Sequence, residues 1–489
     1  MNPIAEHPPA AHRAHAHDIT SAPDRRPWSV LILLCVAQFM VVLDITVVNV
    51  ALPSIGEALG FARGDLQWVV TAYVVFAGGL LLLGGRTADL LGRRRVFLAG
   101  LVVFTSASLA SGLAPSPAAL IVSRAAQGVG AALLTPAALS LIVATYGGTQ
   151  RTAALSAWGA IGSAGAAAGM LLGGMLTTWL GWASIFLINV PVGVAAGIRA
   201  RSLLPTDQPF ERAGRQLDLA GAASVVAGLV VLIYALQGTA GHGWGSARTL
   251  LLLATAGGML MAFVAVERST GRPLVPPRTW RSRSLVAGAA VMLGATGILV
   301  GSFFLNSLYL QNVVGASALE TGLGFLPIAL AIGLAAHLAS HLLPRAGSRA
   351  LVVIGFALVA AGAALLAAAP DQATYAADVL PGFVVLGLGI GLVFPAASVT
   401  AMGDVDHEGA GLASGVMMTA HEIGAALGVA VLSAVATASS GGSAPTAGFA
   451  GGYEGAFVVA GIVAAALALV ALVALPAVRP ASGARVAMH

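Results

Sequence analysis

An acidic residue stands inside the first long apolar run of this 489-residue chain. Asp44 lies in the segment LDITVVNVALP, which spans residues 43–53, and two further ionisable residues, Arg124 and Glu422, lie within later apolar runs. An ionised side chain is costly inside hydrocarbon, so such residues mark proton or cation sites by default. The chemistry that these residues could perform is therefore the binding and release of a proton or a cation within a membrane.

Asp44 and Arg124 lie at comparable depths if each run crosses a bilayer. Asp44 precedes the expected outer end of its run by about nine residues, or roughly 13 Å, and Arg124 lies about seven residues, or roughly 10 Å, into the fourth run. Burial favours a neutral carboxyl and a nearby guanidinium favours a carboxylate, so a change in their separation could switch protonation. The alternative is a structural carboxylate that bonds to Thr46 or Asn49. Direct or water-mediated coupling of the pair is a hypothesis, because depth gives no lateral distance.

Glu422, beside His421, lies near the middle of a late apolar run, roughly 15 Å from its cytoplasmic end. It suits a second proton site or a site for cationic substrates, and a structural hydrogen bond to a neighbouring helix is the alternative. His337 and His341 are spaced i and i+4 on one helix face, which suits a metal pair or a pH sensor. Their nearness to Arg345 favours interfacial or packing histidines, so no metal site is predicted.

The elements that must position these residues are membrane helices. The sequence is 58% hydrophobic and only 9% charged, which excludes a soluble domain. Runs of about the 20 apolar residues needed to span a bilayer predict an all-α integral membrane protein with roughly fourteen transmembrane helices. The runs begin near residues 29, 66, 96, 118, 153, 183, 217, 250, 285, 322, 351, 377, 412 and 456.

The placement of the basic residues predicts the orientation of these helices. All 24 basic residues are arginines, and with the N-terminus inside the cell only Arg63 and Arg248 fall in outer loops. Because basic residues gather in cytoplasmic loops, we expect an even number of crossings with both termini in the cytoplasm. The net charge of +5 reflects this topology, so no nucleic-acid partner is expected.

Several classes of protein are excluded by what the sequence lacks. The single cysteine, Cys35, excludes a disulfide framework within one chain. Without a lysine no phosphate-binding loop of the G-x-x-x-x-G-K type can form, so ATP-driven pumping and a cofactor are not expected. No pairing of nucleophile and base, metal cluster or large soluble domain supports a membrane enzyme or a sensor.

A glycine- and arginine-rich turn follows the second run. The segment GRTADLLGRRR at residues 85–95 has glycines suited to a tight turn, and Asp89 is expected to accept hydrogen bonds at a helix N-terminus or to pair with Arg. The segment resembles the loop signature of the major facilitator superfamily, with Arg86 and Leu90 as departures. A second segment, PRAGSR at residues 344–349, is less similar to this signature and suggests that the chain consists of two related halves.

The resemblance extends to one branch of that family, the fourteen-helix drug:proton antiporters. Residues 43–53 match its first-helix signature, and the fourth-helix signature is matched by Arg124, Gln127, Gly128 and Gly130. The segment IFLINVPVG at residues 185–193 is similar to its sixth-helix motif. Gly165, Gly169 and Gly173 match the glycines of its antiporter motif, and they suit close helix packing. The prolines usual in that motif are missing here.

The resemblance implies two six-helix halves, at residues 29–201 and 285–476, and two extra central helices in the linker 202–284. Residues 1–28 and 477–489 are expected to be cytoplasmic tails, the first of them disordered. The implied function is proton-coupled efflux of hydrophobic or cationic drugs or antibiotics through alternating access, by a monomer in the bacterial plasma membrane. The alternative is a proton symporter of the same fold that imports a nutrient or amino acid. The substrate is not specified by any of these motifs.

The candidate site residues fall into four groups. We expect Asp44, Arg124 and Glu422 to couple transport to protons, and Gly165, Gly169 and Gly173 to pack helices together. The loop motif is expected to act in gating through Gly85, Asp89, Gly92, Arg93 and Arg94. Candidates for the substrate cavity between the halves are Tyr73, Gln127, Trp158 and Tyr309.

Overall fold

The computed structural model is helical, with no strand among the residues that it describes. These are residues 26–62, 65–207, 218–270, 273–276, 279–370, 372–403, 410–439 and 445–476. The expected tails at residues 1–28 and 477–489 lie outside them, apart from residues 26–28, which begin the first helix. The first seven helices are α1 (Arg26–Leu59), α2 (Trp68–Leu91), α3 (Arg93–Gly112), α4 (Pro117–Thr145), α5 (Gly148–Leu180), α6 (Ser184–Leu187) and α7 (Asn189–Leu203).

The remaining helices follow after residue 217. They are α8 (Leu219–His242), α9 (Ala247–Ser269), α10 (Arg283–Asn312), α11 (Ala318–Gly324), α12 (Leu326–Ala367), α13 (Leu380–Ala401), α14 (Ala410–Ser439) and α15 (Pro445–Ala474), with short turns of 3₁₀- and π-helix at Thr279–Arg281 and Tyr375–Val379. The seventh and eighth apolar runs are thus confirmed as helices, α8 and α9.

Twelve segments of the described residues are long and apolar enough to cross a membrane. One of them, Ala318–Ala367, is 50 residues long and contains Gly347 at φ 78° and ψ 164°, outside helical geometry. Gly92, between α2 and α3, also has a positive φ, of 102°. Only glycine adopts such angles readily, so both of the related glycine-arginine turns contain a glycine that the backbone requires. α12 therefore consists of two helices that meet at Gly347.

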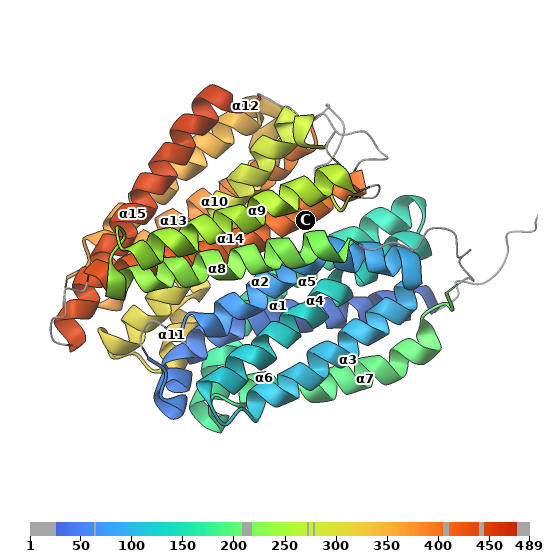
Figure 1. The fold of residues 1–489 in the computed structure, drawn as a ribbon, viewed down its shortest axis with the longest axis horizontal. Helices are drawn as coiled ribbons and strands as arrows, with labels where there is room; N and C mark the ends of the chain where they lie inside the picture. The colour runs from blue at the N-terminus through green and yellow to red at the C-terminus, as the bar shows by residue number, and fades with distance from the viewer. Residues whose placement is uncertain are drawn as a thin grey trace, which may run out of the picture.

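Two groups of helices pack mainly within themselves, as Figure 1 shows by colour. Helices α1 to α7, here the N-group, contain the neighbouring pairs α1–α5, α2–α4, α3–α4 and α3–α7, and helices α10 to α15, the C-group, contain α10–α14, α12–α13 and α12–α15. The α8–α9 hairpin lies against the junction of the two groups, with α8 packed on both α2 and α14. The most apolar stretch of α9 is only 11% buried, so this helix presents most of its surface outward.

The first helix is longer than the sequence analysis expected. α1 runs to Leu59, beyond the outer end that was expected about nine residues after Asp44, and contains Pro53, so Asp44 lies nearer the middle of the helix. Membrane helices tolerate an internal proline where a neighbouring group satisfies the carbonyl that the proline frees. We call the end of the molecule with the α1–α2 turn the α1–α2 end, and the opposite end, with the Gly92 turn, the α2–α3 end.

The predicted glycine stripe on α5 packs against α1. A Cβ atom at Gly173 would lie 2.8 Å from the carbonyl oxygen of Val47, and one at Gly169 would overlap Thr46 Oγ1. The same kind of contact joins α10 and α14, where a Cβ at Gly428 would overlap the backbone of Gly297. Glycine thus allows close backbone approach at one helix pair in each group, and the α5 stripe fixes the surface of α1 that follows Asp44.

Gly169→Leu is expected to lower the free energy of unfolding by about 1–3 kcal/mol, because the new side chain must push α5 away from Thr46. Thermal unfolding in detergent measures this loss. Gly165→Ala is the matched control on the same stripe, since its Cβ would lie 3.3 Å from Val42 and needs only a small adjustment. Equal stability of the two variants would contradict the packing role of the stripe.

Candidate proton-coupling site

Five buried polar side chains from four helices of the N-group, Asp44 among them, form one cluster. We call them the Asp44 cluster; its members are Asp44 of α1, Ser108 of α3, Arg124 and Gln127 of α4, and Asn189 of α7. None of these residues is more than 2% exposed. Because polar groups at such depth need partners, their bonds define the chemistry of the site.

Asp44 accepts hydrogen bonds from three side chains. Its Oδ2 lies 2.5 Å from Arg124 Nη1, which makes a buried ion pair. Its Oδ1 accepts from Gln127 Nε2 at 2.7 Å and from Asn189 Nδ2 at 2.9 Å. Asp44 and Arg124 are therefore in direct contact, as one of the two expected arrangements required, and their role in proton coupling stays a prediction.

The guanidinium of Arg124 has further partners besides Asp44. Nε donates to the carbonyl oxygen of Val69 at 2.9 Å, and Nη1 also donates to Gln127 Oε1 at 2.8 Å. The guanidinium carbon lies 4.4 Å from the ring centroid of Tyr73 and 5.6 Å from that of Phe186, within the range of cation–π attraction. These contacts hold the guanidinium in place independently of Asp44.

Ser108 and Asn189 are members of the cluster that the sequence analysis did not single out. Ser108 Oγ donates to the carbonyl oxygen of Phe186 at 2.9 Å and accepts from Gln127 Nε2 at 3.1 Å and from Asn189 Nδ2 at 3.0 Å. This uses the full bonding capacity of a hydroxyl. Asn189 lies in the segment at residues 185–193 that is similar to the sixth-helix motif. Ser108 is a single serine in an apolar helix, and such a serine does not by itself predict a polar site.

One nearly continuous helical segment positions Asn189. α6 ends at Leu187 and α7 begins at Asn189, and Ile188 between them keeps helical angles of φ −61° and ψ −28°. The carbonyl of Phe186 accepts from Ser108, and the side-chain amide of Asn189 donates to Asp44. Two residues about one turn apart thus both contact the cluster.

Glu422 lies outside this cluster. It is on α14, where a Cβ atom at Gly78 of α2 would overlap Glu422 Cβ, so it packs where the two helix groups meet. His421 Nδ1 lies 3.7 Å from Glu422 Oε1. The structure therefore unites Asp44, Arg124 and Gln127 and leaves Glu422 outside their hydrogen bonds, and its coupling role stays a prediction.

The loop motif at the α2–α3 end anchors α3 to two other helices. Arg93 Nη1 donates to the carbonyl oxygen of Ser140 in α4 at 3.4 Å, and Arg94 Nη2 donates to that of Arg201 in α7 at 2.6 Å. Gly85 of the same motif lies in α2, where a Cβ atom would be 3.6 Å from Pro136. These contacts tie the ends of α3, α4 and α7 together.

The N-terminus of α3 is capped by Asp207, which corrects the expectation for Asp89. Asp207 accepts from the backbone N–H of Arg94 at 3.0 Å and of Arg95 at 3.1 Å, and it lies so close to Gly92 that a Cβ there would overlap it. Asp89 is an exposed residue within α2 and does not cap α3. Asp207, which follows α7, takes the capping position because the end of α7 lies beside the start of α3. The spacing of residues around Asp89 could not predict this contact.

The four cavity candidates do not meet in one place. Tyr73 and Gln127 are fully buried beside Arg124, whereas Tyr309 stacks on Tyr453 in the C-group with ring centroids 4.0 Å apart. Trp158, on α5, is 9% exposed. A cavity of about 440 Å³ at the α2–α3 end is lined by Thr87, Leu91, Arg95, Val96, Ala99 and Leu133, all from the N-group. A substrate cavity between the groups stays a prediction.

His337 and His341 contact one another on an exposed face of α12, with ring centroids 4.9 Å apart. No group of three or more metal-binding side chains occurs in the part of the chain that the structure describes. Both rings stand on the surface, as expected for interfacial histidines.

Comparison with known proteins identifies the family to which the chain belongs. Residues 34–429 match the model described as Major Facilitator Superfamily. The puromycin resistance protein of Streptomyces alboniger is 43% identical over 85% of this chain and 82% of its own length. For the cephamycin export protein of Amycolatopsis lactamdurans the identity is 42%, over 83% of this chain and 84% of that protein. For the lincomycin resistance protein of Streptomyces lincolnensis it is 38%, over 87% of each.

A solved structure shares the fold. It is a bacterial homologue of the human lysosomal transporter Spinster, in an inward-facing and occupied conformation, with a TM-score of 0.65 over 94% of this chain and all of that one. At 16% sequence identity the likeness extends to the fold alone.

Proposed function

Since the chain belongs to the major facilitator superfamily, we propose that it exports antibiotics or related hydrophobic or cationic compounds from a bacterial cell in exchange for protons. The Asp44 cluster is the observation that carries the coupling, because it presents a buried carboxyl with a matched cation and amide donors. The relatives named for puromycin resistance, cephamycin export and lincomycin resistance support antibiotics as the substrates.

Fourteen crossings fit the helices better than twelve. The 50-residue segment Ala318–Ala367 counts as two crossings when it is divided at Gly347, and α5 is 33 residues long, enough to add one more. On this assignment residues 29–201 and 285–476 form the two six-helix halves. The linker 202–284 contributes α8 and α9, which cover the junction of α2 and α14.

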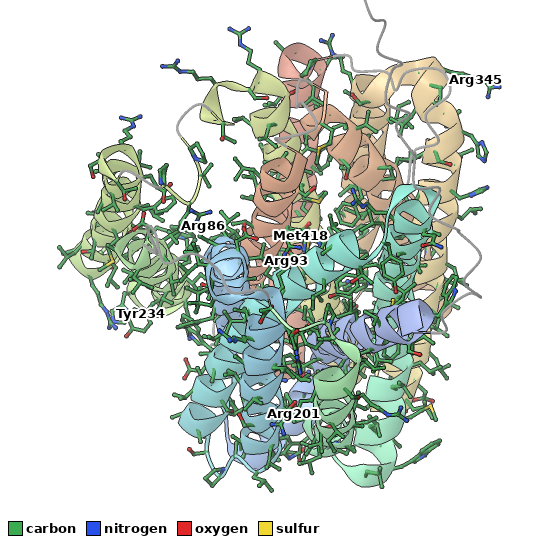
Figure 2. The ribbon with its side chains drawn as sticks, turned by 90° about the vertical axis from the view of Figure 1, so that its right-hand side faces the viewer. Arg86, Arg93, Arg201, Tyr234, Arg345 and Met418 are labelled. Atoms are coloured by element: carbon green, nitrogen blue, oxygen red, sulfur yellow. The ribbon has the colours of Figure 1, made fainter. Side chains whose placement is uncertain are left out.

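We assign the α2–α3 end to the cytoplasm. Arg86, Arg93, Arg201 and Arg345 are labelled in Figure 2, which looks onto the right-hand side of Figure 1. Arg93 begins α3 and Arg201 lies near the end of α7, and the loop motif joins these two helix ends at the α2–α3 end. Clustering of arginine on one side follows the positive-inside rule, and it supports cytoplasmic termini and an outer α1–α2 end.

The transport cycle we propose uses Asp44 as the group that exchanges protons. In the described conformation its carboxylate is paired with Arg124, and rearrangement of α1 against α4 would expose it for protonation from outside. Each charge that crosses the membrane field supplies about 2.3 kcal/mol per 100 mV, which is enough to drive export against a gradient. Glu422, where α14 meets α2, is a candidate for a second proton or for the charge of a cationic substrate. A monomer contains all of these groups.

Expression in an antibiotic-susceptible bacterium tests the proposal. Resistance to one or more of puromycin, lincomycin and the cephamycins is expected to rise severalfold over an empty-vector strain. In everted vesicles with an acid interior, the same compound should release protons from the interior as it enters. Substrate entry accompanied by proton movement in the same direction as the substrate would instead identify a symporter and overturn the proposed exchange.

A further inference from the structure

Two side chains of α10 bond to the backbone of α1 across the boundary between the helix groups. Ser307 Oγ donates to the carbonyl oxygen of Asn49, and Gln311 Nε2 donates to that of Val50 at 2.9 Å. Gln311 Nε2 also lies 3.3 Å from Ser307 Oγ, so the two side chains support one another. Ser307 is fully buried. Carbonyls inside a helix ordinarily bond within that helix, so the contact at Asn49 needs an explanation.

Pro53 explains the contact at Asn49. In an α-helix the carbonyl of Asn49 accepts from the N–H of the residue four positions later, which is Pro53, and proline has no N–H. An unsatisfied carbonyl is costly in an apolar interior. Ser307 supplies the donor that α1 cannot, so the proline creates an acceptor that the opposite helix group satisfies.

Both bonds lie where the two groups are packed backbone to backbone. A Cβ atom at Gly174 of α5 would lie 2.6 Å from the carbonyl oxygen of Ala318 in α11, and one at Gly322 would overlap the carbonyl oxygen of Met170. These contacts, like the two α10 bonds, are near the α1–α2 end. Water has little room to replace Ser307 there while the groups are in contact.

We propose that Pro53, Ser307 and Gln311 form a latch that holds the α1–α2 end closed and that opens once in each transport cycle. The inference rests on alternating access, as in the proposed function. While the end is closed, Ser307 satisfies the carbonyl of Asn49, and Gln311 adds a bond to the carbonyl of Val50. When the groups separate, water enters and hydrates the freed Asn49 carbonyl, so the latch can break without leaving a dry, unsatisfied acceptor. Pro53 thus leaves the Asn49 carbonyl to accept from Ser307 in the closed conformation and from water in the open one.

Distances between two spin labels at the α1–α2 end test the latch in the full-length protein. Cys35→Ser removes the native thiol, and cysteines at exposed Ala58 and Asn312 receive the labels. We expect the double variant Ser307→Ala with Gln311→Ala to raise the ratio of long to short distances by about threefold or more, as the loss of membrane hydrogen bonds predicts. Ser302→Ala is the matched control, since Ser302 is on the same helix and its buried hydroxyl has no hydrogen-bond partner.

A Pro53→Ala background separates the latch from general loosening. Restoring the N–H at position 53 gives the Asn49 carbonyl a partner within α1, so Ser307→Ala should have a much smaller effect in that background than in the wild type. Equal effects in both backgrounds, or a double variant no different from Ser302→Ala, would overturn the latch. The measurement needs no substrate or proton gradient, so failure to export any tested antibiotic would count against the proposed function alone.

Discussion

Asp44→Asn is expected to abolish proton-coupled transport while the protein still folds. An asparagine at this position keeps the shape of the side chain and an oxygen that can accept from Arg124, but it cannot bind and release a proton. The guanidinium of Arg124 retains the carbonyl of Val69, the amide of Gln127 and the ring of Tyr73 as partners. Substrate-driven proton release from everted vesicles should therefore fall to the level of empty membranes.

Glu57→Gln is the control for this variant. Glu57 lies on the same helix as Asp44 and its side chain is exposed, so the substitution removes one negative charge from α1 without touching the cluster. Its proton release and the resistance that it confers should match those of the wild type. If Asp44→Asn exchanged substrate for protons at the wild-type rate, Asp44 would be a structural carboxylate, and the site of coupling would have to be sought elsewhere, first at Glu422.

The apolar runs predicted most of the helices because a bilayer imposes a minimum length on every crossing. The same rule does not locate the end of a helix. α1 continues through Pro53 to Leu59, and Ser307 of α10 donates to the carbonyl that Pro53 frees. This contact comes from another helix, which a hydropathy pattern does not contain.

The members of the Asp44 cluster could likewise be predicted only in part from the sequence. The cost of a buried charge singled out Asp44 and Arg124, and their depths allowed them to meet. The packing of α3 and α7 against α1 decides which other polar residues join the cluster. The roles of Ser108 and Asn189 therefore could be identified only from the structure. Asp207 was missed for the same reason, since its capping contact joins residues more than 100 positions apart.

Arg124→Gln is expected to destabilise the protein by about 3–5 kcal/mol, because it leaves the carboxylate of Asp44 buried without its cation. The exposed fraction of Arg124 is 1% and that of Asp44 is 0%, so water cannot replace the lost partner without rearrangement of the helices. Thermal unfolding in detergent should show a large drop in the midpoint. Arg248→Gln, at an exposed position on α9, should change stability by no more than about 0.5 kcal/mol.

The double variant Asp44→Asn with Arg124→Gln decides what the ion pair does. With neither charge present, two amides can bond to one another and to Gln127, so most of the stability lost in Arg124→Gln should return. Transport should not return with it, because the cluster still lacks a group that exchanges protons. A folded but inactive double variant would show that the pair serves proton coupling and that the fold can do without it. A double variant as unstable as Arg124→Gln would show instead that the guanidinium holds α2 and α4 together through Val69 and Tyr73, independently of Asp44.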